Sequence, residues 1–186
     1  MAEQKTEQKE YKGEGFGSEF VEKTIEIRRV AKVVKGGRRF SFRVTVIVGD
    51  RGGQVGAGVG KANTVPEAIK KATTYARKKL RRMHLYETTI PHMVVGRTGG
   101  SEVLLKPASP GTGVIAGGGV RAVLQAVGVQ DILTKSMGSP NIHNVVMATM
   151  DALDKLKSVD DQASMRGKDV SELKPFWSRR SKKNGS

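Results

Sequence analysis

One stretch of the sequence, residues 39–46, constrains the fold more than any other because its apolar and polar residues alternate strictly. The apolar series is Phe40, Phe42, Val44 and Val46, and Val48 continues it. The residues between them are Arg39, Ser41, Arg43 and Thr45. Successive side chains of a strand point to opposite faces of a sheet. The stretch is therefore predicted to be a strand with one core face and one wet face.

The next predicted strand, residues 54–61, alternates small apolar side chains with bare glycines at Gly56, Gly58 and Gly60. Glycine in a strand interior weakens the strand, because it has no side chain to pack. Such a cost indicates that something approaches this backbone closely. The sequence leaves open whether that is a bound partner or a neighbouring element of the chain.

A longer strand is predicted before these two, over residues 23–34. Ile25 and Ile27 alternate, and the pattern shifts at residues 28–30, which predicts a bulge there. The turn at residues 35–38 contains two glycines, and glycine supplies the positive φ that tight hairpin turns need. The three strands are therefore expected to form one antiparallel sheet.

A helix is predicted to follow, because Thr64-Val65-Pro66-Glu67 is a capping box with proline in the first turn. Its apolar residues recur at steps of three and four and form one stripe. They are Ile69, Ala72, Ala76, Leu80 and Met83. We expect this stripe to cover the aromatic face of the sheet, which gives a β-β-β-α unit.

Positive charge is concentrated in this first unit. From Lys23 to Arg82 there are 17 Lys and Arg against three Asp and Glu, whereas from Met83 to Ser158 there are six against five. The whole chain carries a formal net charge of +15. An excess confined to one unit favours a polyanionic partner, and a nucleic acid is preferred over a merely solvated surface.

Several classes of function lose support from the composition. The chain has no Cys, which removes disulfide frameworks, thiolate metal sites and Cys nucleophiles. His84, His92 and His143 lack metal-ligand spacing, and no nucleophile elbow or paired carboxylate indicates catalysis. The sequence has no apolar run of transmembrane length and no secretory signal. We expect a cytoplasmic protein that contacts no membrane, binds no metal or cofactor and is not an enzyme.

The second unit is predicted to be α/β. Its strands are expected at 93–95, 102–106 and 129–136. A helix over residues 120–127 should end at Gly128, which suits the left-handed position after a helix. Ile132 and Leu133 should point inward, and a last helix should run from residue 139 to about residue 157.

Four segments follow from these patterns: a mobile N-terminal arm at 1–22, a basic RNA-binding domain at 23–86, an α/β domain at 87–158 and a C-terminal extension at 159–186. The extension ends in a basic cluster beside Phe176 and Trp177. The cluster is expected either to touch RNA or to serve as a solubilising tail, and the sequence favours neither.

Two glycine-rich stretches raise the possibility of nucleotide binding. Residues 56–62 fail as a phosphate loop, because Val55 stands where glycine is required and Ala62 where Ser or Thr would bind Mg²⁺. Residues 111–116 fit the loose dinucleotide fingerprint, with Asp131 at about the expected distance. The surrounding prolines and glycines favour an ordered loop, so a nucleotide-using enzyme is kept only as a weaker hypothesis.

The residues expected to bind RNA lie on the first hairpin and on the glycine strand. Lys and Arg neutralise phosphates and release counterions, and bare glycine backbone allows a close approach. These residues are Arg28, Arg29, Lys32, Lys35, Gly36, Gly37, Arg38, Arg39, Gly56, Gly58 and Lys61. Phe40 and Phe42 are assigned to the core and Tyr75 to a structural role. Recognition of folded RNA by shape is therefore favoured over stacking on single-stranded bases.

Three blocks of the sequence resemble the family of small-subunit ribosomal protein five in its bacterial form. They are residues 28–42, residues 48–62 and residues 106–118, and Gly138-Ser139-Pro140-Asn141 agrees with them. The resemblance covers residues 20–158 in order. It indicates a ribosomal protein of a bacterium or an organelle.

This resemblance implies an α+β protein with two small domains. The first would resemble a double-stranded-RNA-binding fold without its first helix, and the second would be α/β with a left-handed βαβ crossover. Members are structural constituents of the small ribosomal subunit and are not enzymes. Their implied partners are small-subunit rRNA, ribosomal proteins four and eight, and mRNA near the entry channel, with a role in decoding accuracy and no homo-oligomer.

The resemblance also assigns residues. The loop beside the spectinomycin site of relatives corresponds to Lys32, Val33, Val34, Lys35 and Gly36. The contact with ribosomal protein four corresponds to Gly117, Gly118 and Arg121. The alternative to a ribosomal constituent is a free regulator that binds double-stranded RNA and carries an appended interaction domain.

Overall fold

The structure, a computed structural model, describes residues 20–173. Most of the arm predicted at 1–22 and the basic cluster near Trp177 lie outside the described residues. The first strand begins at Val21, two residues before the predicted start of the first domain.

The first unit is a four-stranded antiparallel sheet in the order β1-β2-β3-β4, with one helix. Its elements are β1 (Val21–Val34), β2 (Gly37–Gly49), β3 (Gln54–Ala62), α1 (Val65–Lys78) and β4 (Arg81–Arg82). The β-β-β-α prediction is confirmed, and β4 adds a short strand that pairs with the start of β3.

The second unit has a sheet in the order β5-β6-β8-β7. Its elements are β5 (Val94–Thr98), β6 (Ser101–Pro107), β7 (Val114–Ile115), α2 (Gly118–Val127), β8 (Ile132–Gly138) and α3 (Ile142–Asp154). Strands β7 and β8 pair in parallel, so β7, α2 and β8 form a β-α-β unit. Two short helices follow, α4 (Val159–Arg166) and α5 (Val170–Leu173). The α+β class is confirmed.

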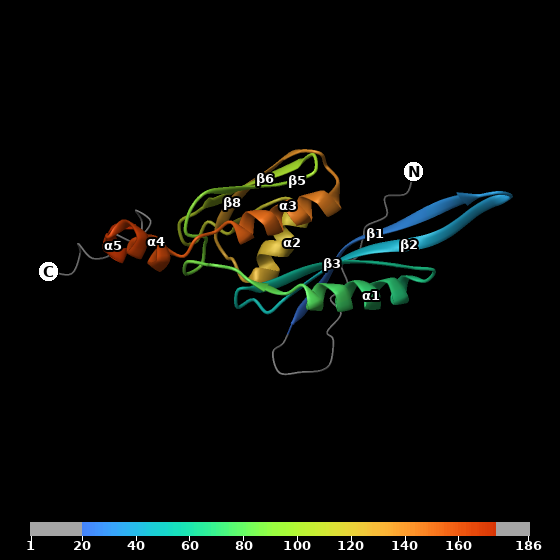
Figure 1. Ribbon diagram of the computed structural model, residues 1–186, viewed down its shortest axis with the longest axis horizontal. Coiled ribbons are helices and arrows are strands. Elements are labelled where there is room, and N and C mark those ends of the chain that lie inside the picture. Colours follow the sequence, from blue (N-terminus) through green and yellow to red (C-terminus); the bar gives the residue numbers. More distant parts are fainter. Residues whose placement is uncertain (1–19, 174–186) are drawn as a thin grey trace.

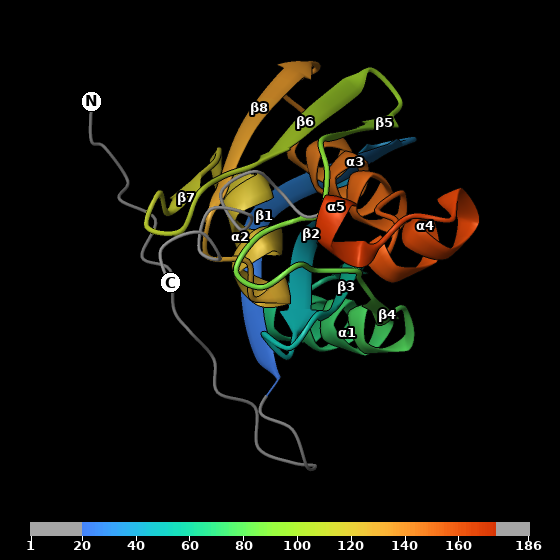
Figure 2. The ribbon, with the colours of Figure 1, turned by 90° about the vertical axis from the view of Figure 1, so that its left-hand side faces the viewer.

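The two units stack in four layers (Figures 1 and 2). The second sheet lies at the top of Figure 2, α2 and α3 lie beneath it, the first sheet comes next, and α1 covers its far side. Two hydrophobic clusters match these layers. Val44, Val46 and Val48 pack with α1, whereas Ile47 and Val55 pack with the second unit.

Close packing of α1 on β3 explains the alternating glycines. A Cβ at Gly56, Gly58 or Gly60 would lie well under 3.0 Å from a carbonyl oxygen of α1. The helix presents its smallest side chains to the sheet, and the buried residues of α1 are Ala68, Ala72 and Ala76. Of the two readings that the sequence left open, the neighbouring element is confirmed.

The predicted wet face of β2 is wrong at its inner end. Thr45 is 3% exposed and Ile47 is fully buried, because the second unit packs against this face. The aromatic face also differs from the prediction. Phe42 is half-buried beside the α1 cluster, but Phe40 is 47% exposed because it lies farther out along the hairpin.

The start of α1 agrees with the predicted helix, but its end does not, because the predicted apolar stripe continued to Met83. Pro66 lies in the first turn, yet the side chain of Thr64 makes no capping hydrogen bond. The helix ends at Lys78, because the chain turns back to pair β4 with β3, and Met83 joins the other hydrophobic cluster. The strand irregularity lies between Thr24 and Glu26 rather than at 28–30.

In the second unit the end of α2 is confirmed, since Gly128 has a left-handed φ of 103°. The strand predicted from residue 129 begins at Ile132. Ile132 is buried as predicted, but Leu133 is 36% exposed on the outer face of the sheet, so its predicted inward position is wrong.

Candidate nucleic-acid interface

The β1–β2 hairpin extends away from the body of the molecule (Figure 1). Its tip is a two-residue turn formed by Lys35 and Gly36, and Gly36 has a φ of 90° that favours glycine. All hairpin residues predicted to bind RNA are exposed, as is Lys61 on β3. The structure therefore presents these residues to solvent on an extended arm.

Cationic side chains face one another across the strands of this hairpin. Arg28 lies opposite Arg43, and Arg43 lies opposite Lys61, so three cations form one row across β1, β2 and β3. Nearer the tip, Lys32 lies opposite Arg39. Like charges directly opposite each other destabilise a sheet. An anionic partner would offset that cost, so the rows favour binding of a polyanion.

The other face of the hairpin carries an aromatic contact. The guanidinium of Arg29 lies 3.8 Å from the ring centroid of Phe40, a cation-π geometry. Val33, farther out on the same strand, is 74% exposed. The assignment of Phe40 to the core is therefore wrong, and this ring supports an arginine on the surface instead.

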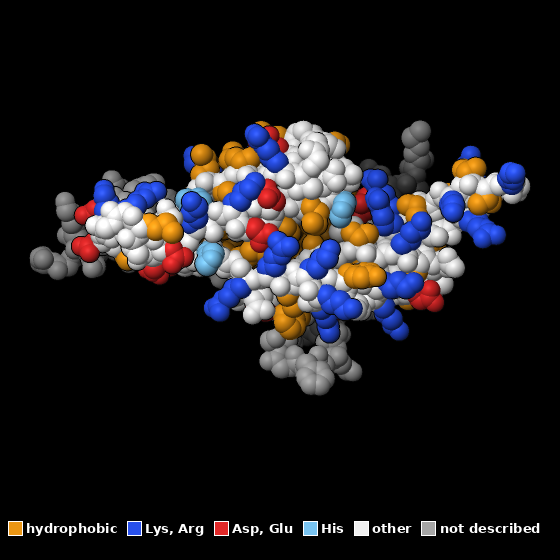
Figure 3. All heavy atoms as spheres, in the orientation of Figure 1, with side chains coloured by type: hydrophobic (Ala, Val, Ile, Leu, Met, Phe, Trp, Pro, Cys, Tyr) orange, Lys and Arg blue, Asp and Glu red, His pale blue; other side chains and the backbone are white. Residues whose placement is uncertain are grey.

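Few acidic groups neutralise these cations. Glu26 pairs with Arg28 at 2.5 Å, and Glu22 pairs with Arg77 at 2.8 Å. Within residues 20–173, no ion pair occurs at a larger set of hairpin and neighbouring cations, namely Lys32, Lys35, Arg38, Arg39, Arg43 and Lys61. Lys and Arg side chains crowd the hairpin and α1 (Figure 3). The exposed positive charge is thus available to a partner.

Two predicted RNA-binding residues lie elsewhere. Gly56 and Gly58 are buried, and α1 already occupies the space beside their backbone. The close approach that their lack of a side chain permits is made by the helix. The structure therefore contradicts the prediction that RNA reaches these two glycines.

The residues predicted to contact another protein lie at the start of α2. Gly117 is the N-cap of α2, and Gly118 and Arg121 follow it, all three exposed. The Arg121 guanidinium donates to the Val114 carbonyl at 3.2 Å, which holds it against β7. A Cβ at either glycine would meet nothing within 4 Å, so this surface is open.

The loop before β7 is organised by a buried carboxylate. Asp131 is 5% exposed, and the Gly113 N–H donates to its Oδ1 at 2.9 Å. This hydrogen bond, with others from the side chain of Thr88 and the backbone of Gly111 and Thr112, holds the pKa of Asp131 below its ordinary value despite burial. Asp131 thus binds its own loop, and the weaker dinucleotide hypothesis loses its ribose ligand.

Sequence reasoning missed a cavity of about 410 Å³ between the first sheet, α1 and α3. Arg43, Lys79, His143 and Tyr75 are among its lining residues. Burial lowers the pKa of His143, and the charges of Arg43 and Lys79 lower it further, against an opposing effect of Glu26. No local pattern could reveal this cavity, because four elements from both units build it.

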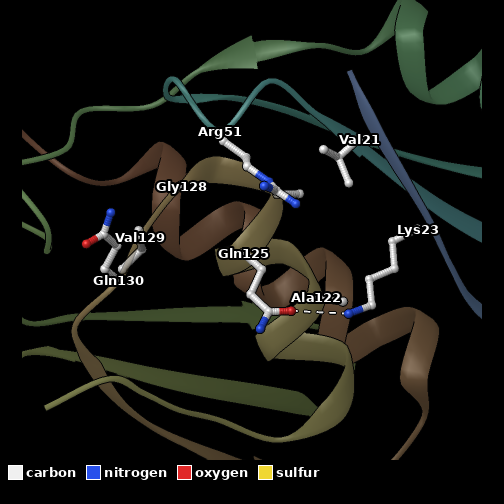
Figure 4. A pocket seen from close by; sticks show the side chains of 9 residues that line it. Val21, Lys23, Arg51, Ala122, Gln125, Gly128, Val129 and Gln130 are labelled. Carbon is white, nitrogen blue, oxygen red and sulfur yellow. Dashed lines mark hydrogen bonds between the residues drawn. The ribbon is translucent and has the colours of Figure 1, made fainter. Parts of the chain in front are cut away.

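A second cavity, of about 380 Å³, lies at the opposite seam between the units (Figure 4). Figure 4 shows Lys23 reaching across to Gln125, and the Lys23 Nζ donates to the Gln125 Oε1 at 3.1 Å. Backbone hydrogen bonds reinforce this seam, from Arg51 N to the Ala126 oxygen at 3.0 Å and from Gly53 N to the Val127 oxygen at 2.9 Å. This region joins the two units.

Other kinds of site find no support in the part of the chain that the structure describes. There, no cluster of three His, Asp or Glu side chains could hold a metal ion. None of the described helices is long and apolar enough to span a bilayer.

Comparison with protein families gives a match for each unit. The N-terminal domain of ribosomal protein S5 matches residues 20–84, and the C-terminal domain of ribosomal protein S5 matches residues 96–166. The chain belongs to the ribosomal protein S5 family. The resemblance that the hairpin and glycine motifs indicated is thereby confirmed.

Two bacterial members of the S5 family are similar to this chain over nearly their whole length. The small ribosomal subunit protein uS5 of Syntrophobacter fumaroxidans is 53% identical over 156 residues, which is 84% of this chain and 94% of the relative. That of Lawsonia intracellularis is 54% identical over 149 residues, which is 80% of this chain and 91% of the relative. This S5-family chain is therefore of the bacterial type, a structural ribosomal protein and not an enzyme.

Proposed function

We propose that this S5-family chain is built into the small ribosomal subunit of the cytoplasm and binds small-subunit rRNA through its β1–β2 hairpin. One observation carries the proposal. The hairpin extends from the body and bears exposed cations without acidic partners among the described residues, including Lys32, Lys35, Arg38 and Arg39. Such side chains bind phosphates and release condensed counterions.

The proposed interface has two parts. The tip, with Lys35 and Gly36, meets the sugar-phosphate backbone, because the glycine turn adds no side chain that would hold it away. The cross-strand rows behind the tip, at Arg28–Arg43–Lys61 and Lys32–Arg39, follow the phosphates inward. Recognition by shape and charge suits a folded rRNA, whose phosphates occupy fixed positions.

The tip also carries the proposed link to decoding. Residues 32–36 correspond to the loop that lies beside the spectinomycin site in relatives, and all of them except the half-buried Val34 are exposed, which supports a contact with rRNA there. We place mRNA near the entry channel on the same side and attribute a role in decoding accuracy to the order that the hairpin imposes on rRNA.

The second unit is the proposed contact for proteins. Its near-neutral charge avoids the desolvation cost that unpaired cations would add to a protein interface. Gly117, Gly118 and Arg121 form an open surface at the start of α2, which we assign to ribosomal protein four. Ribosomal protein eight would contact another part of this unit, and no homo-oligomer is required.

Crosslinking in cells tests this proposal. A tagged full-length chain is expected to sediment with small subunits at low salt. Ultraviolet crosslinking followed by sequencing should recover small-subunit rRNA, with the crosslinked peptides on the β1–β2 hairpin. Protein that stays near the top of the gradient, or crosslinks as readily to arbitrary RNA duplexes, would instead favour the free double-stranded-RNA-binding regulator.

A further inference from the structure

The 410 Å³ cavity at the junction of the units has the composition of a binding site. Strand β3 runs between α1 and α3 there (Figures 1 and 2). The lining residues come from four elements and the end of one of them, with Arg43 and Thr45 from β2, 57–59 from β3, Tyr75 from α1 and Lys79 just after it, and His143, Val146 and Met147 from α3. Small-molecule sites typically occupy roughly 300 to 1,000 Å³, so one nucleotide fits this volume.

The cavity is electropositive. Arg43, Lys79 and His143 line it, and none of its lining residues is acidic. Arg43 and Lys79 make no ion pair with any described residue. Lys61 lies beside Arg43 on β3 and adds to the local positive field, whereas Arg28 on β1 is paired with Glu26. Burial lowers the pKa of His143, and the charges of Arg43 and Lys79 lower it further, against an opposing effect of Glu26.

One side-chain nitrogen of His143, a residue that lines this cavity, lacks a hydrogen-bond partner among the described residues. The Nδ1 of His143 is buried and has no hydrogen-bond partner among the described residues. Buried polar side-chain atoms in folded proteins are nearly always hydrogen-bonded. Because this atom is closed to solvent, a nucleotide in the cavity would reach it only if the imidazole ring turned.

The cavity also offers surfaces for a planar group. Tyr75 is 52% exposed although sequence reasoning gave it a structural role, and it stands one helical turn from Lys79. Val146 and Met147 supply apolar surface from α3. An aromatic ring beside unpaired cations is the arrangement by which proteins stack a base while they hold its phosphate.

We propose that this cavity holds one unpaired nucleotide of the bound rRNA, with its phosphate between Arg43 and Lys79 and its base against Tyr75. An unpaired nucleotide is required, because only a base outside a helix can present its face to a side chain. The inference rests on the proposed rRNA function and adds a second point of contact. The row Arg28–Arg43–Lys61 connects this site with the hairpin.

The charge part of the proposal is tested by salt-dependent binding of the full-length chain to transcribed small-subunit rRNA. The pocket variant is Arg43→Gln with Lys79→Gln. The matched control is Lys70→Gln with Lys78→Gln, which removes two exposed lysines of α1 outside the cavity. Because one phosphate contact contributes roughly 0.7 to 0.9 to the slope and both cations hold the same phosphate, the pocket variant should lose about 0.8 units and the control under half a unit. Equal losses would show a diffuse field and would overturn the proposal.

The stacking part is tested by Tyr75→Leu, which keeps apolar bulk and removes the ring. Affinity is expected to fall by about tenfold with no change in the salt slope, since stacking of a base releases no counterion. An unchanged affinity would overturn the assignment of a nucleotide to this cavity. If the double charge variant is unstable, Lys79→Gln alone, at the exposed C-cap position of α1, is compared in the same way with Lys78→Gln.

The hairpin variant Lys32→Ala, Lys35→Ala, Arg38→Ala separates this inference from the proposed function. Loss of rRNA affinity in the hairpin variant but not in the pocket variants would leave the proposed function intact and reject the nucleotide site. Unchanged rRNA affinity in the hairpin variant and in the pocket variants would reject both the proposed function and the nucleotide site. Loss in both, with the salt-slope pattern above, supports both.

Discussion

At the scale of residues, Asp131 illustrates how one carboxylate can define a loop. It lies immediately before β8 and accepts the Gly113 N–H, so that the glycine-rich loop before β7 is fixed beside a central strand of the second sheet. The hydrogen bonds stabilise the ionised form and lower the pKa of Asp131. The loop leads directly to the proposed protein contact at Gly117.

Asp131→Asn should therefore destabilise the protein by about 1 to 2 kcal/mol at neutral pH, since hydrogen bonds to a charged acceptor are the stronger kind. Because the folded pKa is depressed, this contribution is complete above the unfolded pKa of about 3.9 and is lost as the pH falls through the lower folded value. Urea unfolding at several pH values measures it. The exposed control Asp161→Asn should change the free energy of unfolding little. If Asp131→Asn still lowered the free energy of unfolding by the same amount at about pH 2, this explanation would be contradicted.

At the scale of elements, contact between glycine and alanine sets how closely helices lie on the sheets. Helix α1 meets Gly56, Gly58 and Gly60, and α3 meets Gly96 of β5 through Ala148 and Ala152 in the same way. In each case a Cβ on the glycine would overlap helix backbone. Both units therefore place a helix close to a strand where two small residues coincide.

Gly58→Ala tests this packing. The added methyl would collide with the Ala72 carbonyl, and forcing the helix outward should cost about 1 to 3 kcal/mol or more. Gly118→Ala is the control, because a Cβ there meets nothing within 4 Å and the residue is helical. The midpoint of denaturant unfolding should fall for Gly58→Ala and stay level or rise for Gly118→Ala. Equal midpoints for the two variants would show that α1 does not press on β3.

Local sequence patterns predicted burial correctly where the covering element is near in the sequence. They failed where the covering element is distant in the sequence. Alternation was sufficient to find β2 and β3, because α1, which covers them, follows directly in sequence. Thr45 was misjudged because the second unit, much later in the sequence, covers the other face. Phe40 was misjudged because α1 does not extend along the hairpin to reach it.

The candidate site divides in the same way. The hairpin cations could be predicted from the sequence, since they lie close together in it and their excess is visible by counting. The cavity with Arg43, Lys79 and His143 could not, because it exists only once β2, α1 and α3 have come together. The buried glycines were taken for an RNA contact because a missing side chain does not reveal what fills the space.

At the scale of the whole molecule, the two units form one body. The backbone hydrogen bonds of Arg51 and Gly53 to α2 cross the seam, and Arg81 pairs with Asp154 on the opposite unit. The larger hydrophobic cluster includes Ile47 and Val55 from the first unit together with most of the second. The rigid body thus holds a basic arm and a near-neutral face in a fixed relation.

This continuity predicts a single cooperative unfolding transition. Native-state hydrogen exchange should give amides of β2 at 45–48 and amides of α2 at 122–126 the same free energy of opening within about 1 kcal/mol, because global unfolding limits both. A second-unit core that exchanges through a separate, less stable opening would show that the seam is weak and that the units act as independent domains.

The central claim is that hairpin cations dock this S5-family protein on rRNA phosphates, and the salt dependence of binding measures it most directly. The variant Lys32→Ala, Lys35→Ala, Arg38→Ala is compared with Lys106→Ala, Lys135→Ala, Lys157→Ala, which removes three exposed lysines from the second unit. The hairpin variant should lower the slope of log affinity against log salt by about 2 to 3 units, at roughly 0.7 to 0.9 per lost phosphate contact, and the control should leave it nearly unchanged. An unaltered slope in the hairpin variant would show that these side chains do not contact phosphate.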